Sequence, residues 1–174
     1  MSGPASSHSW FCFSLSLAPG LVRERLQGVL LPAVPEGELA EALDVELVYD
    51  VRAPDWDGRV ARLVAAPGQR LAGRLRAVPP PFWPQVRALE EQLAQATHAH
   101  PVHVRTASGA LVTAQAFTPP APASPDRGPV SQDFLGALAR AAAYARLPPP
   151  YVTRLQAEAQ LVQTVQRAQT ERPR

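Results

Sequence analysis

Two neighbouring glutamates, Glu90 and Glu91, are the residues of this sequence best suited to acid–base chemistry. They lie within residues 84–96, where apolar residues recur at the spacing of an amphipathic helix. A helical carboxylate that faces a pocket can take up and return a proton during a reaction. Charged helix residues face solvent by default, however. The sequence therefore favours a solvent-facing position for both glutamates, and leaves open a role for either one at a pocket rim.

Three histidines, His98, His100 and His103, follow in the pattern His-x-His-x-x-His. Histidine is a common zinc ligand and occurs at short spacings in metal sites. No cysteine follows this run, and no acidic residue lies close to it in the sequence. We therefore expect solvated or hydrogen-bonded histidines, with no metal site and no cofactor.

The candidate nucleophiles are Ser14, Ser16 and Cys12, and none has the setting that nucleophilic catalysis needs. No Gly-x-Ser-x-Gly elbow surrounds either serine, and loop serines more often bind backbone groups. Cys12 lies in an apolar segment and is expected to be buried and inert. As the only cysteine it excludes an intramolecular disulfide, which predicts a reducing, cytoplasmic location.

Composition argues against two further classes of function. The chain of 174 residues has 17 basic and 15 acidic side chains, so its formal net charge is only +2. Aromatic residues make up 6% of the sequence, and no basic run accompanies them. This composition argues against a nucleic-acid partner. The apolar stretch at residues 10–17 is too short to span a membrane, so we expect no membrane partner either.

The elements that must position these residues begin with strands. Residues 10–17 are apolar and aromatic, which predicts a first strand. Residues 43–51 alternate apolar and polar side chains, which predicts a half-buried strand. Residues 60–65 and 70–78 flank Pro67-Gly68, so they are predicted to form a hairpin with a tight turn.

Helices dominate the second half of the predicted fold. After the helix that carries the two glutamates, residues 102–106 and 110–117 are predicted to form a second hairpin. Ser131 is a good N-cap for a helix over residues 132–146, and a last helix covers residues 151–169. Strands, one inserted helix and a closing helical hairpin predict the α+β class, with a mainly antiparallel sheet or small barrel.

The length of the chain suits one domain, which we expect to cover residues 10–171. Residues 1–9 and 172–174 are small or polar and are predicted to be flexible ends. The Pro-rich residues 119–129 are predicted to form a loop, because prolines at this density prevent a helix.

Three motifs occur in order along the chain. The first, after the first predicted strand, is Phe13-Ser14-Leu15-Ser16-Leu17. The second combines Pro67-Gly68 with a following strand that contains Gly73. The third is Ser131 with Phe134 and Leu135, then Leu147-Pro148-Pro149-Pro150-Tyr151 and Leu155. Their order and spacing resemble the γ-glutamylcyclotransferase-like (AIG2-like) family, which carries Tyr-Gly-Ser-Asn-Leu in the first of these positions.

The resemblance implies the fold of that family and a ligand site between the first loop and the closing hairpin. The implied ligand-binding residues are Phe13, Ser14, Leu15, Ser16, Leu17, Phe134 and Tyr151. The family's catalytic Glu, in a Leu-Asp-x-x-Glu-Gly context, falls at Leu93 of this sequence. Leucine moves no proton, so the resemblance implies a divergent member without standard cyclotransferase activity. Such a protein is expected to bind a small amino-acid-like or anionic ligand at the backbone of Leu15 to Leu17.

Two alternatives stay open. The first is an active cyclotransferase-type enzyme that releases 5-oxoproline, with Glu90 or Glu91 as its base. The second is a protein-interaction scaffold, monomeric or weakly homodimeric, that uses the Pro-rich loop and the last helix. A carboxylate within hydrogen-bond reach of the first loop favours the enzyme, whereas an apolar wall at Leu93 favours the divergent form.

Overall fold

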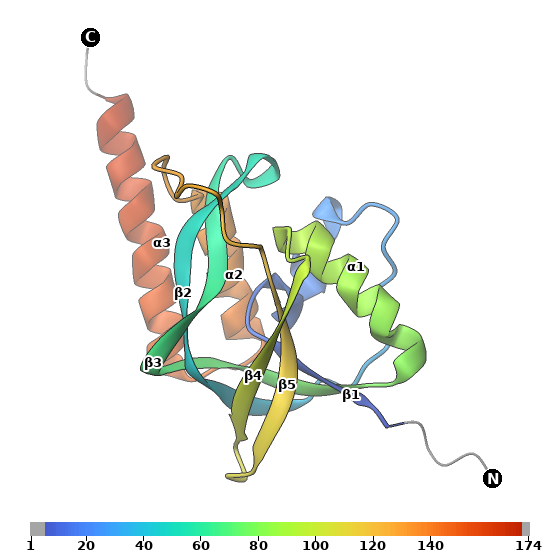
Figure 1. The fold of residues 1–174 in the computed structure, drawn as a ribbon. Coiled ribbons are helices and arrows are strands. Elements are labelled where there is room, and N and C mark those ends of the chain that lie inside the picture. The colour runs from blue at the N-terminus through green and yellow to red at the C-terminus, as the bar shows by residue number, and fades with distance from the viewer. Residues whose placement is uncertain (1–5, 172–174) are drawn as a thin grey trace, which may run out of the picture.

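The computed structural model describes residues 6–171, which are built around a closed five-stranded barrel (Figure 1). Around the barrel the strands follow the order β1 (His8–Cys12), β3 (Gly58–Val78), β2 (Glu38–Ala53), β4 (His98–Thr106) and β5 (Leu111–Thr118). The neighbours pair antiparallel, except that β1 meets β5 in parallel. Closure leaves no sheet edge that lacks a partner strand.

The short strand β1 closes the barrel, and it lies very close to β3. Its residues from His8 to Cys12 pair along β3, and Trp10 also pairs with Gln115 of β5. At Gly73 of β3, an added Cβ would lie 2.4 Å from the Cys12 carbonyl oxygen. Only glycine permits this approach, because any other side chain would force the two strands apart.

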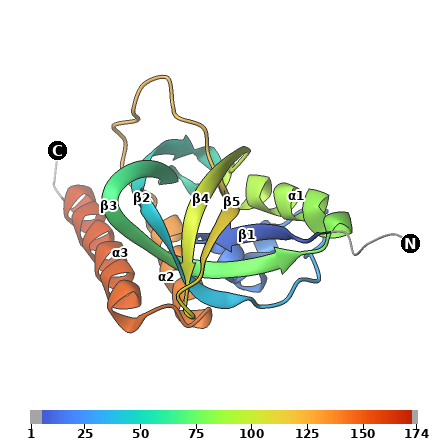
Figure 2. The same cartoon turned by 60° about the horizontal axis from the view of Figure 1, so that its bottom comes forward.

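Three helices cover the barrel from different sides. They are α1 (Trp83–Ala94), α2 (Gln132–Tyr144) and α3 (Pro149–Thr170). Figures 1 and 2 both show α1 and α3 on opposite sides of the barrel. Short 3-10 helices connect the other elements, at Leu15–Leu17 (η1), Pro19–Arg25 (η2), Pro54–Trp56 (η3) and Pro80–Phe82 (η4).

The buried side chains form two clusters, and β1 contributes to both. One cluster consists almost entirely of strand residues, and it includes Phe11 and Val104. The other joins the helices to the barrel, and it includes Trp10, Cys12 and Leu89. Successive strand residues point to opposite faces, so β1 supplies both clusters by alternation. The loop after β1 therefore begins at the boundary between the two clusters.

Several sequence predictions are confirmed. The α+β class holds, and α1 and the β4–β5 hairpin lie where the sequence placed them. The Ser131 hydroxyl accepts from the Phe134 N–H at 3.0 Å, as an N-cap should. α2 and α3 are two distinct helices, as predicted; the chain turns between them at residues 145–148, and Pro149 to Tyr151 already form the first turn of α3. Residues 119–129 contain neither helix nor strand.

The predicted hairpin across Pro67-Gly68 is wrong. Residues 58–78 form one continuous strand, β3, which pairs with β2 on both sides of that dipeptide. The irregularity is a bulge, where the Gly68 N–H donates to the Asp44 carboxylate at 2.7 Å and the register of β2 shifts. The chain reverses instead after Ala53, where Asp57 takes a left-handed backbone conformation with φ 49°.

The ends of the first strand also differ from the prediction. β1 includes His8 and Ser9, which were expected in a flexible end, and it stops at Cys12 instead of Leu17. The Leu17 N–H then donates to the Ser14 carbonyl at 3.0 Å, which bends the chain into η1. Residues 1–5 and 172–174, the remainder of the predicted flexible ends, lie outside the described residues.

None of the helices within residues 6–171 combines the length and apolar character that crossing a lipid bilayer requires.

We predict that Ser131→Ala lowers the unfolding free energy by about 1–2 kcal/mol, since it removes an N-cap. It also removes a buried hydrogen bond to the Trp56 carbonyl. Chemical denaturation measures the loss. Ser124→Ala, an exposed substitution in the Pro-rich loop, is the matched control. Equal stability of both variants would contradict the role given to Ser131.

Candidate functional site

The Glu90 carboxyl group is buried against the loop that follows β1. Its Oε1 atom accepts two hydrogen bonds, from the Trp10 indole Nε1 at 3.0 Å and from the Ser16 hydroxyl at 2.7 Å. The residue is only 3% exposed. A carboxyl group within hydrogen-bond reach of the first loop is the arrangement that the sequence analysis named as favouring an enzyme.

Three elements bring these groups together. Trp10 points to the helix side of β1, Ser16 lies in the η1 turn, and Glu90 lies on the buried face of α1. The Arg76 guanidinium of β3 fixes the turn from another side, because it donates to the Ser16 carbonyl at 3.4 Å and to the Leu17 carbonyl at 3.2 Å. It also lies 5.4 Å from the centre of the Trp10 ring. The site is thus held by contacts far apart in the sequence.

Burial changes the chemistry of Glu90. Loss of solvent raises its pKa to about 7, against the opposing effects of the Ser16 and Trp10 hydrogen bonds and the Arg76 charge. Both protonation states are therefore populated near neutral pH, where a general acid–base group works best. Both hydrogen bonds go to Oε1, and Oε2 accepts none from the described residues. The second oxygen is therefore the one left without a hydrogen-bond donor among the described residues.

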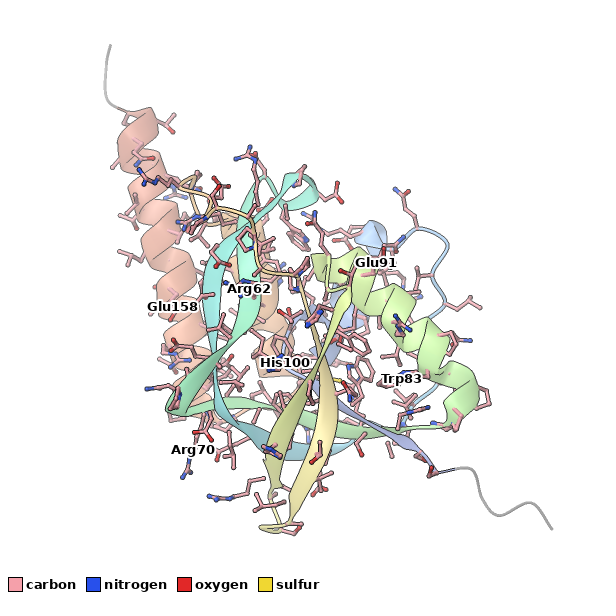
Figure 3. All side chains as sticks on the ribbon, viewed as in Figure 1. Arg62, Arg70, Trp83, Glu91, His100 and Glu158 are labelled. Carbon is pink, nitrogen blue, oxygen red and sulfur yellow. The ribbon has the colours of Figure 1, made fainter. Side chains whose placement is uncertain are left out.

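The solvent-facing prediction was wrong for Glu90, whereas Glu91 is exposed as predicted. Figure 3 labels Glu91 and Trp83 towards the two ends of α1. The sequence did contain a signal for Glu90. It follows Val86 by four residues and precedes Leu93 by three, which places it on the apolar stripe of the helix.

Leu93 forms an apolar wall one turn further along α1. Its side chain is 1% exposed and belongs to the core, and its carbonyl accepts from the Trp56 indole at 2.9 Å. The position where the family resemblance places a catalytic Glu is thus occupied by core packing. Both of the alternative signals named from the sequence are present, one turn apart on the same helix.

The first loop is more tightly packed than its predicted ligand role suggests. Phe13, Ser14, Leu15, Ser16 and Leu17 are all buried. The sequence predicted that the backbone N–H groups of Leu15 to Leu17 hold an anion. The Leu17 N–H instead donates to a carbonyl within the turn, so it is not free for that role. The Phe13 ring stacks on Phe11 with centroids 6.2 Å apart. Within the loop, Ser16 is the residue whose side chain binds Glu90.

Phe134 and Tyr151, two further predicted ligand-binding residues, make no hydrogen bond to Glu90 among the described residues and lie in other surroundings. Phe134 is fully buried and meets the Trp56 ring edge-on at 5.5 Å. Tyr151 of α3 lines a hollow of about 230 Å³ whose lining also includes Tyr49 of β2 and Glu158 of α3. Figure 3 labels Glu158 on the side of α3 next to the strands. Its buried hydroxyl has no hydrogen-bond partner among the described residues, and burial raises its pKa to about 12.

The remaining candidates show no catalytic arrangement. Within residues 6–171 no three His, Cys, Asp or Glu side chains come close enough to hold a metal ion. His98 and His103 of β4 are exposed, and His100 is partly exposed. Cys12 is fully buried, and loss of solvent raises the pKa of its thiol well above the usual range. A thiol in this state is a poor nucleophile.

Comparison with known proteins addresses the fold. The sequence matches no family model and no curated protein sequence. Among solved structures, a γ-glutamyl cyclotransferase aligns with a TM-score of 0.65 and 19% identity, over 87% of this chain and 87% of that chain. The chain has a γ-glutamylcyclotransferase-like fold. This confirms the fold that the sequence resemblance implied.

Two further structures share this γ-glutamylcyclotransferase-like fold. The uncharacterized protein loc79017 from Homo sapiens aligns with a TM-score of 0.65 and 17% identity, over 88% of each chain. YkqA from Bacillus subtilis aligns with a TM-score of 0.61 and 15% identity, over 90% of this chain and 55% of YkqA. At such identities the likeness concerns the backbone, so function has to be argued from the site.

We predict that Glu90→Gln changes how stability depends on pH. The Glu90 pKa is raised from 4.5 to about 7, so the folded state holds this proton more tightly than the unfolded chain does. Its stabilising contribution is complete below about pH 4.5 and is lost as pH rises through about 7. Glutamine stays neutral at every pH. The unfolding free energy of the variant minus that of the wild type should therefore increase by roughly 3 kcal/mol from about pH 4 to about pH 8.

Urea unfolding at the two pH values measures this difference. Glu91→Gln removes an exposed carboxylate from the same helix, and its stability should follow that of the wild type at both values. A Glu90→Gln difference that stays constant with pH would show that Glu90 does not titrate in this range.

Proposed function

We propose that the protein is a cyclotransferase-type enzyme that releases 5-oxoproline from a γ-glutamyl compound, with Glu90 as its acid–base group. The observation that carries the proposal is the buried Glu90 carboxyl, held by Trp10 and Ser16 beside the loop after β1. The fold shared with a γ-glutamyl cyclotransferase supports the reaction class. The acid lies one helical turn before the position where the family resemblance places it.

The reaction needs one group that accepts a proton and then returns it. The substrate's α-amino nitrogen attacks its own γ-carbonyl carbon, which forms the lactam C–N bond. The Glu90 carboxylate takes the proton that this nitrogen loses. The amide C–N bond then breaks, and the departing amine takes the same proton back from Glu90. No water and no cofactor enter this balance, so a single carboxyl group with a pKa near 7 suffices.

The surrounding residues position this carboxyl group. Trp10 and Ser16 bind Oε1, which orients Oε2 for the proton transfer. Arg76 holds the carbonyls of the η1 turn and so keeps the Ser16 hydroxyl in place. A group fixed in advance loses little entropy when the substrate binds. These three residues are positioning residues in the proposal.

A second candidate is a divergent protein of this fold that binds a small ligand without turning it over. The buried Leu93 side chain favours it, because it fills the position where the resemblance places the acid. The dense packing of Leu15 and Leu17 favours it as well. In this case Glu90 serves to hold Trp10 and Ser16 together, and its titration has no catalytic consequence.

A product assay separates the two candidates. We expect the purified protein to release 5-oxoproline from γ-glutamyl dipeptides, and Glu90→Gln to lower kcat by about 10²-fold or more. The rate should rise with pH as Glu90 loses its proton around pH 7. Glu91→Gln, on the exposed side of α1, is the matched control and should retain the wild-type rate.

The opposite outcomes are equally clear. No turnover of any γ-glutamyl dipeptide by the folded wild-type protein would favour the non-catalytic candidate. Turnover that survives Glu90→Gln would place the acid–base group elsewhere.

A further inference from the structure

A hollow of about 520 Å³ lies beside the η1 turn, and two buried arginines line it. Arg74 is 7% exposed and Arg76 is 9% exposed. They stand two residues apart on β3, so their side chains point to the same face of the strand. The other lining residues are Leu17, Glu36, Tyr144, Ala145 and Arg146.

Backbone carbonyls fix both guanidinium groups in place. Arg74 donates to the Ala145 carbonyl at 2.8 Å and to the Gly37 carbonyl at 3.0 Å. Arg76 donates from Nε to the Glu36 carbonyl at 3.2 Å, and its two Nη atoms bind the η1 turn. Neutral acceptors orient these cations without cancelling their charge. A guanidinium has five N–H donors, and the carbonyls use three of them on Arg76 and two on Arg74, so both groups keep donors for a ligand.

The hollow has more positive than negative charge. Arg74, Arg76 and Arg146 line it, whereas Glu36 is the one acid in its lining. The Glu36 carboxylate lies 3.3 Å from Arg74 Nη2, and its side chain is 70% exposed. The Glu36 side of this ion pair faces solvent, so its carboxylate can turn into water while an incoming anion takes its place on the buried Arg74 guanidinium.

We propose that this hollow binds a small ligand with two or more negatively charged oxygens, either a phosphate group or a dicarboxylate, in place of the Glu36 carboxylate on Arg74. Planar guanidinium groups bind both kinds of oxyanion through paired N–H donors. Two such groups on one strand face, with Arg146 at the rim, provide that chemistry in a space large enough for a small molecule. The site uses none of the acid–base chemistry assigned to Glu90, so it goes beyond the proposed function.

Isothermal titration calorimetry at constant ionic strength, with inorganic phosphate and glutarate as probes, tests the site. We expect saturable binding of at least one probe. Glu36→Gln removes the competing carboxylate and should tighten binding about fivefold, while Arg146→Gln should weaken it by a similar factor. Both side chains are exposed, so these variants should fold normally. Arg87→Gln on α1, an exposed arginine away from the hollow, is the matched control and should bind as the wild type does.

Some outcomes of this titration distinguish a phosphate-bearing ligand from a dicarboxylate, and others refute the site. Tighter phosphate than glutarate binding identifies a phosphate-bearing ligand, and the reverse identifies a dicarboxylate. The site is refuted if neither probe binds to the wild type or to Glu36→Gln. It is also refuted if Arg87→Gln weakens binding as much as Arg146→Gln, because the effect would then be one of net charge. No substrate is present, so failure of the turnover assay leaves this test unaffected.

Discussion

The closure of the barrel by β1 is the constraint on which the rest of the structure depends. Five residues of β1 join β3 to β5, and the contact is close enough to require glycine at position 73. The alternation of side chains along so short a strand sends Trp10 towards the helices and Phe11 towards the strand cluster. The loop that follows then has to turn at once, and this turn presents the Ser16 hydroxyl to α1. The short strand β1 therefore both closes the barrel and sets the position of Trp10 and Ser16 in the site.

A buried carboxyl group and a buried guanidinium group both bind the η1 turn. The Glu90 carboxyl binds the side chain of Ser16, and the Arg76 guanidinium binds the carbonyl of the same residue. Loss of the Glu90 carboxyl would leave the Trp10 indole and the Ser16 hydroxyl without their acceptor. Loss of Arg76 would leave the Ser16 and Leu17 carbonyls without its N–H donors. The stability of the turn and the position of the Glu90 carboxyl therefore both depend on Ser16. A family resemblance centred on backbone motifs does not reveal this coupling, because Ser16, Arg76 and Glu90 lie on three separate elements.

The sequence predicts those parts of the fold that depend on local patterns. Helical spacing located α1, and Ser131 located the start of α2, because both signals act within a few residues. The hairpin predicted at Pro67-Gly68 was wrong because a dipeptide suited to a turn also suits a bulge. What distinguishes the two is the contact of Gly68 with Asp44, which lies 24 residues away in the chain. The position of Glu90 on the apolar stripe was visible, but its burial depends on Trp10, 80 residues away. The arginines of β3 were not identified as a site, since only the folded barrel places them beside residues 144–146.

The buried thiol of Cys12 makes the closing strand observable. It is the single cysteine of the chain and lies at the end of β1, opposite Arg74 of β3. The thiol belongs to the cluster that joins the helices to the barrel, so a thiol reagent reaches it only when the packing of this cluster around β1 opens. The rate at which the native protein consumes such a reagent therefore reports the free energy of that local opening, as hydrogen exchange does for amides. This one atom serves as a built-in kinetic probe of how often the packing between the helices and β1 opens.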